Sequence, residues 1–173
     1  DSQVDLLFGV PLAGVLLLAP RNDDQTISLL NEWGLPFVII GSSGFPDCNY
    51  VDGDQAAAGA IAVRHLIQLG RRRVAFLAST DNYEPAVARE RGYRTELEHE
   101  SLPIRNEWII RTQPTVEGGY EAASRILALK DRPDSIWAYN DVVAVGAIRA
   151  AHQLGYHVPR DLSIVGYDDS AIA

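Results

Sequence analysis

The sequence contains no methionine, only one cysteine and no Asn-x-Ser/Thr site for N-glycosylation. These features bear on the cellular compartment of the protein and on whether the chain is a whole translation product. A single cysteine, Cys48, cannot form a disulfide within the chain, which fits a protein from a reducing compartment. Because the chain starts at Asp1 and holds no methionine, it is expected to be a processed or excised part of a longer product. We therefore expect a cytoplasmic protein of which this sequence is a fragment.

Basic charge and long apolar runs are also scarce. The 15 Lys and Arg residues face 23 Asp and Glu residues, and the formal net charge is -8. The summed field of such a chain repels nucleic-acid phosphates and anionic lipid surfaces. No apolar run approaches the roughly 20 residues that span a bilayer. We expect no membrane partner and no nucleic-acid contact by this segment itself.

Motifs of the common enzyme classes are missing as well. There is no Gly-x-Gly-x-x-Gly, no Walker-type Gly-Lys-Ser/Thr and no Gly-x-Ser-x-Gly. The four histidines are scattered and lack the spacing of zinc ligands: His65, His99, His152 and His157. The adjacent acids Asp168 and Asp169 point in different directions from a strand end, so they do not flank a common bond. We expect no enzyme, no metal ion and no cofactor.

Helical segments and short apolar runs alternate along the chain. Apolar residues at helical spacing end three times at a glycine (Gly34, Gly70 and Gly155), the residue that best adopts the left-handed conformation past a helix. A continuous apolar run follows each time, as expected for parallel strands buried on both faces. The expected strands are residues 14–19, 37–40, 74–78, 108–110, 135–139 and 163–167. The pattern predicts an α/β fold with doubly wound parallel sheets.

Polar side chains collect where these strands end. Arg-Asn-Asp-Asp follows the first run, Asn140 and Asp141 follow residues 135–139, and Asp168 and Asp169 follow the last strand. Open parallel sheets bind ligands outside the carboxyl ends of their strands. The recurrence of charged and amide groups at this one edge predicts a polar ligand.

From Asp54 to Asp169 the order of motifs resembles the effector-binding core of the LacI/GalR family of bacterial transcriptional regulators. The most specific part is "NDVVAVGAIRAAHQLGYHVPRDLSIVGYDD", and a weaker likeness extends back to "AGVLLLAP", so that nearly the whole chain is covered. The resemblance implies a periplasmic-binding-protein-like fold of two Rossmann-like lobes. Residues 1–69 would form a partial N-terminal lobe and residues 70–173 the C-terminal lobe. The arginine run in Gly70–Arg73 would be the crossing between them, although a solvent-exposed connection is the alternative.

Four residues match the effector-contacting pattern of that family: Asp54, Arg89 in "RERGY", Asn140 and Asp168. Such a set suits a sugar, because carboxylates accept hydrogen bonds from hydroxyls, arginine donates in a planar fork and an amide does both. Tyr120 matches a position where the family often carries a ring near the effector, and its face could stack on a sugar. The resemblance thus implies five ligand-binding residues.

Structural alternatives exist for the three residues earliest in the chain. Asp54 can simply cap a helix, and Arg89 can lie solvated on a charged helix. Tyr120 can equally well be a core or helix-face tyrosine. Trp137, inside the run at 135–139, is expected in the core.

The remaining two site residues have an acidic neighbour as competitor. Asn140 and Asp141 compete for one N-cap, and we expect Asp141 to be the cap and Asn140 to face the cleft. Asp168 and Asp169 can together form a turn. We expect Asp168 to contact the effector and Asp169 to form or support the turn.

The resemblance implies a transcriptional regulator, expected to be a repressor, whose lobes close on a small effector. Closure would be coupled to operator DNA binding by a helix-turn-helix that is absent from this chain. A homodimer is expected because operators are typically palindromic, with the apolar residues 6–20 as a candidate surface. The alternative on the same fold is a periplasmic solute-binding protein of a transport system. Residues upstream of Asp1 would separate the two by showing a helix-turn-helix or a signal peptide.

Overall fold

The computed structural model describes residues 11–42, 44–81 and 83–173, and its contacts divide the chain into two compact units. Unit 1 comprises residues 1–53 and 82–85, and unit 2 comprises residues 54–81 and 86–173. The helices and strands, in chain order, are β1 (Val15–Leu18), α1 (Thr26–Glu32), β2 (Phe37–Ile40), β3 (Tyr50–Val51), α2 (Gln55–Gln68), β4 (Val74–Ser79), α3 (Glu84–His99), the 3-10 turn η2 (Asn106–Trp108), β5 (Ile109–Thr112), α4 (Val116–Leu127), β6 (Ser135–Ala138), α5 (Asp141–Gln153) and β7 (Ser163–Val165). Within the described residues, no helix combines the length and the apolar character that a membrane span requires.

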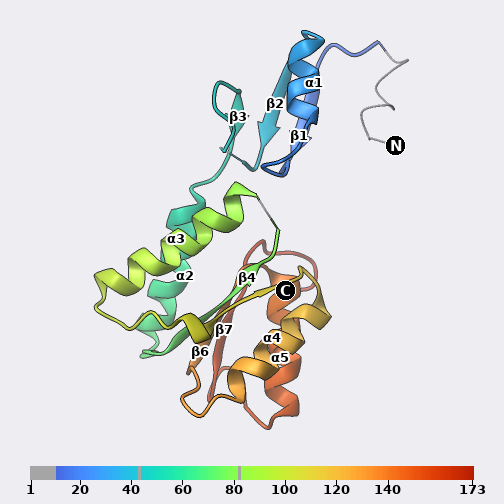
Figure 1. Ribbon diagram of the computed structural model, residues 1–173. Coiled ribbons are helices and arrows are strands. Elements are labelled where there is room, and N and C mark those ends of the chain that lie inside the picture. The colour runs from blue at the N-terminus through green and yellow to red at the C-terminus, as the bar shows by residue number, and fades with distance from the viewer. Residues whose placement is uncertain (1–10, 43, 82) are drawn as a thin grey trace. The chain divides into compact units, whose positions relative to one another are not determined.

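Unit 1 is a parallel sheet in the order β1-β2-β3 with α1 packed on one face (Figure 1). Leu30 of α1 and Ile39 of β2 are both fully buried. The helix ends at Gly34, where φ is +63° and the next amide, of Leu35, donates to the carbonyl of Leu30. The helix end predicted at this glycine is therefore confirmed.

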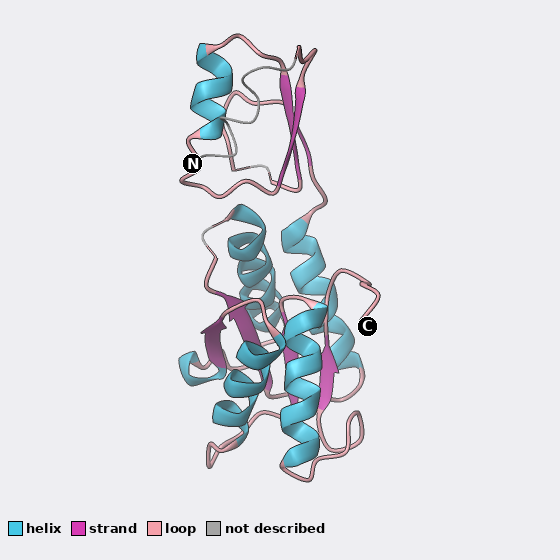
Figure 2. Ribbon diagram, turned by 90° about the vertical axis from the view of Figure 1, so that its right-hand side faces the viewer, coloured by secondary structure: helices cyan, strands magenta, loops and turns pink. Residues whose placement is uncertain are grey.

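Unit 2 is a parallel sheet in the order β5-β4-β6-β7 with helices on both faces. α2 and α3 cover one face, and α4 and α5 cover the other (Figures 1 and 2). Every residue of the two central strands, β4 and β6, is buried. A strand that is covered on both sides has no polar face, which is why these segments read as continuous apolar runs. The doubly wound fold predicted from the runs is confirmed.

Aromatic side chains fill the layer between the unit 2 sheet and α2 and α3. The rings of Phe76 and Trp137 are stacked with centroids 4.4 Å apart, and the ring of Tyr93 stacks on Phe76 at 5.3 Å. The Tyr93 hydroxyl donates to the carbonyl of Val74 at 2.8 Å, and its burial raises the pKa of the phenol. Trp137 is fully buried, as predicted for a core residue.

The boundary between the units differs from the one expected at residue 69. It lies between Gly53 and Asp54, so α2 belongs to unit 2 rather than to the N-terminal lobe. The reason is the apolar face of α2, because Val63, Leu66 and Ile67 are buried in the same core as the aromatic layer of unit 2.

The arginine run at residues 70–73 is correspondingly a turn inside unit 2. It joins α2 to β4, and the amides of Arg72 and Arg73 both donate to the carboxylate of Asp134. Arg71 donates through Nε to Ser163 Oγ at 2.9 Å and through Nη2 to the carbonyl of Pro159. These bonds tie the amino-terminal ends of β4, β6 and β7 together, so the run is not a crossing between units.

Candidate functional site

Arg89 lies at the centre of the polar groups that gather at the carboxyl edge of the unit 2 sheet. Its guanidinium is buried, with 7% of the residue exposed, which excludes the solvated alternative. Nε donates to Gln55 Oε1 at 2.9 Å, and Nη1 donates to the carbonyl of Tyr139 at 2.7 Å. The ring of Tyr167 lies under the guanidinium carbon, 3.7 Å from it. Arg89 is thus held by α2, by the end of β6 and by the segment after β7.

Two glycines explain how α3 brings Arg89 so close to α2. A Cβ atom on Gly92 would lie 1.9 Å from the carbonyl oxygen of Ala56, and one on Gly59 would lie 2.4 Å from the carbonyl oxygen of Arg89. Neither position accepts a larger residue without separating the helices. The glycines five residues after Asp54 and three residues after Arg89 are therefore required by the close helix crossing that builds the site.

Asp54 is the N-cap of α2. Its Oδ1 accepts from the amide of Ala57 at 2.8 Å, so the residue does cap the helix, and its contact with the effector stays a prediction. The residue is exposed and directly precedes Gln55, the hydrogen-bond partner of Arg89. Capping occupies one carboxylate oxygen and leaves Asp54 at the edge of the Arg89 cluster.

The N-cap of α5 is Asn140 and not Asp141, contrary to expectation. Asn140 is the N-cap of α5, with an extended backbone (φ -151°), and its Oδ1 accepts from the amide of Val143 at 2.9 Å. Asp141 is already the first helical residue, and its Oδ2 accepts from the amide and the hydroxyl of Ser170. The difference follows from geometry, since only the extended residue before the helix can direct its side chain back to the third helical amide. The cap bond uses the oxygen of Asn140 and leaves its amide nitrogen available as a donor.

Asp168 lies beside Arg89 but does not form a close ion pair with it. Its Oδ1 is 3.8 Å from Arg89 Nη2, and 47% of the side chain is exposed. Burial raises the pKa of Asp168, while Arg89 opposes the increase and the charge of Asp141 adds to it. The carboxylate and the guanidinium are close enough for one small ligand to contact both.

The chain bends at Tyr167 and Asp168, at the place of the turn that was expected for Asp168 and Asp169. Their φ angles are +110° and +52°, in the region that residues with a side chain seldom adopt. Asp169 is exposed, which agrees with the expected turn role. For Asp168 the two interpretations are compatible, because the turn is what places its carboxylate near Arg89.

Tyr120 is apart from the other four residues. Its hydroxyl donates to Gln153 Oε1 at 2.8 Å, near the carboxyl end of α5. Asn140 precedes the opposite end of the same helix, 13 residues before Gln153. A shallow groove of about 250 Å³ is lined there by Tyr120, Arg149 and Gln153. The contacts favour the helix-face alternative, and a contact of Tyr120 with the effector stays a prediction.

The sequence did not single out Gln55 and Tyr167, the two side chains that hold Arg89. Gln55 directly follows the cap Asp54, and Tyr167 stands inside the Gly-Tyr-Asp-Asp motif. Their positions beside matched residues were a usable signal. Their contacts with Arg89 join residues 34 and 78 positions apart, which no local pattern encodes.

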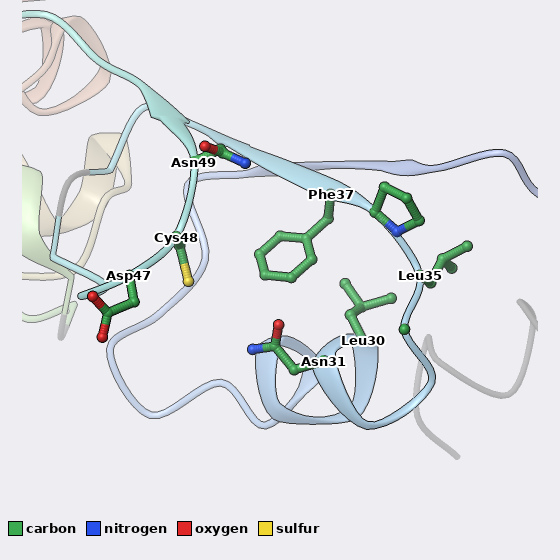
Figure 3. Close-up of a pocket in the computed structure, with 9 residues that line it drawn as sticks. Leu30, Asn31, Leu35, Phe37, Asp47, Cys48 and Asn49 are labelled. Carbon is green, nitrogen blue, oxygen red and sulfur yellow. The ribbon is translucent and has the colours of Figure 1, made fainter.

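A separate pocket of about 270 Å³ lies within unit 1 (Figure 3). Figure 3 shows the ring of Phe37 and the thiol of Cys48 at its wall, with Asn31 of α1 opposite. Phe37 is the first residue of β2, so the pocket lies at the amino end of that strand. Ligands of parallel sheets bind at the other end, and the pocket is therefore not part of the predicted edge.

One group of possible metal ligands occurs among the described residues, Glu96, His99 and Glu100 near the end of α3. Both carboxylate oxygens of Glu96 accept from Arg64, at 2.7 and 2.8 Å. His99 is exposed. The charge of the buried residue, Glu96, is therefore already balanced by Arg64, so this group is a poor candidate for binding a cation.

The chain is similar to known regulators over most of its length. The model of a family described as "Periplasmic binding protein-like domain" matches residues 63–173. The HTH-type transcriptional repressor PurR of Mannheimia succiniciproducens is 31% identical over 170 residues, which cover 97% of this chain and 51% of that protein. The chain spans about half the length of the curated relatives it matches.

Solved structures with the same fold include regulators as well. The complex of the transcriptional regulator CelR with cellobiose has a TM-score of 0.90 and 32% identity, covering 98% of this chain and 53% of that one. A regulatory protein of the LacI family from Chloroflexus aggregans has a TM-score of 0.88 and 33% identity, covering 98% of this chain and 61% of that one.

Proposed function

Because the chain belongs to the periplasmic binding protein-like domain family and corresponds to the effector-binding core of LacI-family regulators, we propose that it senses a small polar effector at the Arg89 cluster. The observation that carries the proposal is the buried guanidinium of Arg89 with Asp168 3.8 Å away. A buried arginine with a carboxylate beside it, at the carboxyl edge of a parallel sheet, is arranged for hydrogen bonding to a ligand.

The chemistry of the cluster favours an uncharged ligand with several hydrogen-bond donors. Asp54 and Asp168 accept, the amide nitrogen of Asn140 donates, and the Nη2 group of Arg89 donates on the side of Asp168. The paired hydroxyls of a sugar can donate to these carboxylates and accept from these N–H groups. The structurally similar regulator CelR was determined as a complex with cellobiose. A nucleobase, with a carbonyl beside N–H groups on one edge, is a second chemical class that fits the same donors and acceptors. A strongly anionic ligand does not, since two carboxylates accompany one guanidinium.

The consequence of binding is proposed to be a change in operator affinity. Two lobes would close on the effector, and a helix-turn-helix outside this sequence would bind DNA as part of a cytoplasmic homodimer. The relatives named as HTH-type repressors support this assignment to a non-enzymatic repressor. The coupling cannot exceed the difference in effector affinity between the two lobe arrangements. Residues 11–20 of the candidate dimer segment 6–20 are described, and residues 6–10 lie outside the described part.

A transport-linked solute-binding protein is the alternative on this fold. The named relatives and solved structures given above are transcriptional regulators, which supports the regulator over the transport role. Mobility-shift assays of the full gene product with its own upstream DNA would separate the two. Specific, effector-sensitive retention supports the regulator, and its absence supports transport.

The test of the site starts from a thermal-shift panel of sugars, sugar phosphates, nucleosides and nucleobases on the full gene product. Calorimetry with a compound that raises the melting temperature then compares Asp168→Asn with Asp169→Asn, its exposed neighbour. We expect at least a tenfold weaker affinity for Asp168→Asn, near-normal affinity for Asp169→Asn, and melting temperatures within a few degrees for both. Equal affinity in wild type and folded Asp168→Asn would remove Asp168 from the site.

A further inference from the structure

The segment that leaves β7 wraps around the side chain of Asp141. The backbone amide of Asp141 donates to the carbonyl of Tyr167 at 2.9 Å. Its Oδ2 accepts from the amide of Ser170 at 2.8 Å and from the hydroxyl of Ser170 at 3.0 Å. A Cβ on Gly166 would lie 2.4 Å from Asp141 Oδ1, so the segment can approach the carboxylate only because residue 166 is glycine. Asp141 itself is buried, with 7% of the residue exposed.

The same segment carries the two groups that face Arg89. The Tyr167 ring lies 3.7 Å from the guanidinium carbon, and Asp168 Oδ1 lies 3.8 Å from Nη2. Asp168 and Asp169 both have positive φ, which is unfavourable for residues with a side chain and persists only where surrounding contacts impose it. The bonds of Asp141 lie immediately before and after these two residues.

We propose that Asp141 is a positioning residue, whose bonds to Tyr167 and Ser170 hold the turn at residues 168 and 169 and thereby keep Tyr167 and Asp168 against Arg89. This role explains why the adjacent residues Asn140 and Asp141 have different functions. Asn140 caps α5, and Asp141, turned toward the neighbouring strand, fixes the segment after β7. The relevance of this positioning to effector binding rests on the proposed function, whereas the positioning itself is present without any effector.

The experiment uses the Arg89 Nε–Hε resonance in a nitrogen-edited NMR spectrum of the effector-free full chain. A proton above an aromatic face is shifted upfield by the ring, so Tyr167→Leu is expected to move this resonance downfield and defines the unstacked position. Asp141→Ala is expected to move it toward that position. Ser170→Ala, which removes one of the two donors to Asp141, is expected to give a smaller move in the same direction. Asp141→Asn retains an oxygen acceptor for Ser170 and is expected to stay near wild type.

Glu117→Ala is the matched control, because it removes an acid from the first turn of α4 as Asp141→Ala does from α5. An Arg89 resonance that moves equally in Glu117→Ala would overturn the proposal, as would one that stays at the wild-type position in folded Asp141→Ala. If Asp141→Ala does not fold, Ser170→Ala decides, and an unmoved resonance in that variant overturns the proposal. A resonance unaffected by Tyr167→Leu would also overturn it, since the stack would be missing in solution. None of these outcomes depends on finding the effector.

Discussion

Two apolar runs with similar composition differ in burial between the two units. Val15–Leu18 of β1 alternates, with Leu16 67% and Leu18 77% exposed, whereas all six residues of Val74–Ser79 in β4 are buried. In unit 2 helices cover both sheet faces, but in the described part of unit 1 only α1 covers a face. A continuous apolar run thus predicts a parallel strand, and the layers around it decide how much of the strand is buried.

The largest expected difference between the units comes from one substitution made in each. Leu66→Ala removes a fully buried side chain from unit 2 and should lower the free energy of unfolding by about 3 kcal/mol. Leu16→Ala removes a side chain of unit 1 that is mostly exposed in the single chain, and it should change the free energy of unfolding of the monomer by no more than about 0.5 kcal/mol. Urea denaturation measures both. A similar loss for the two variants would mean that the exposed face of β1 is covered in solution.

Leu66 also tests the boundary at Gly53 and Asp54, because it lies on α2. Hydrogen exchange should show that Leu66→Ala weakens protection of the β4 and β6 amides, whereas Leu30→Ala, equally buried in unit 1, weakens protection in β2. Loss of protection in β2 without loss in β6 on mutation of Leu66 would return α2 to the N-terminal unit.

A smaller effect is expected from the ion pair that joins α2 to α3. Glu96 is 5% exposed, and its hydrogen bonds with Arg64 hold the pKa of the carboxyl below its ordinary value. A lowered folded-state pKa stabilises the fold above the unfolded pKa of about 4.3, and this contribution is lost as the pH falls through the folded pKa. Glu96→Gln should therefore flatten the loss of stability on acidification, measured by urea denaturation between pH 7 and pH 3. Glu98→Gln, on the exposed face of α3, is the control for removing one acid, and an unchanged acid slope in Glu96→Gln would contradict the account.

The smallest expected change is an increase in stability, and it comes from a substitution at the candidate site of unit 2. This substitution tests whether Asp168 serves effector binding or the stability of the fold. Asp168→Gly relieves a φ of +110° and should raise the free energy of unfolding by about 1 kcal/mol while it weakens effector binding. Thermal denaturation and calorimetry provide the two readouts. A stabilised variant with unchanged affinity would show that the turn alone, rather than the carboxylate, is needed.

The strands and helix ends were predictable because they follow from local rules. Left-handed backbone at Gly34, Gly70 and Gly155 is observed, with φ between +63° and +84°, and each of the six predicted apolar runs overlaps a strand. The strand that was missed, β3 (Tyr50–Val51), is only two exposed residues long and lacks an apolar signal.

The boundary and two of the site assignments depended on contacts between distant segments. The burial of Leu66 in the core of unit 2 assigns α2, and Asp141, which was expected to cap α5, instead accepts from Ser170. Tyr120 matched a motif position, yet the bond of its hydroxyl to Gln153 sets it apart from the cluster. Local pattern therefore predicted which residues are polar at strand ends, and the tertiary contacts show which of them meet.

The most direct test of the effector site is chemical-shift mapping of a compound from the thermal-shift panel on the isotope-labelled full gene product. The account predicts saturable shifts at Asp54, Arg89, Asn140 and Asp168, with the Tyr120–Gln153 groove and the Cys48 pocket unchanged. Saturable shifts confined to the groove or to the pocket, with the Arg89 cluster unmoved, would contradict it.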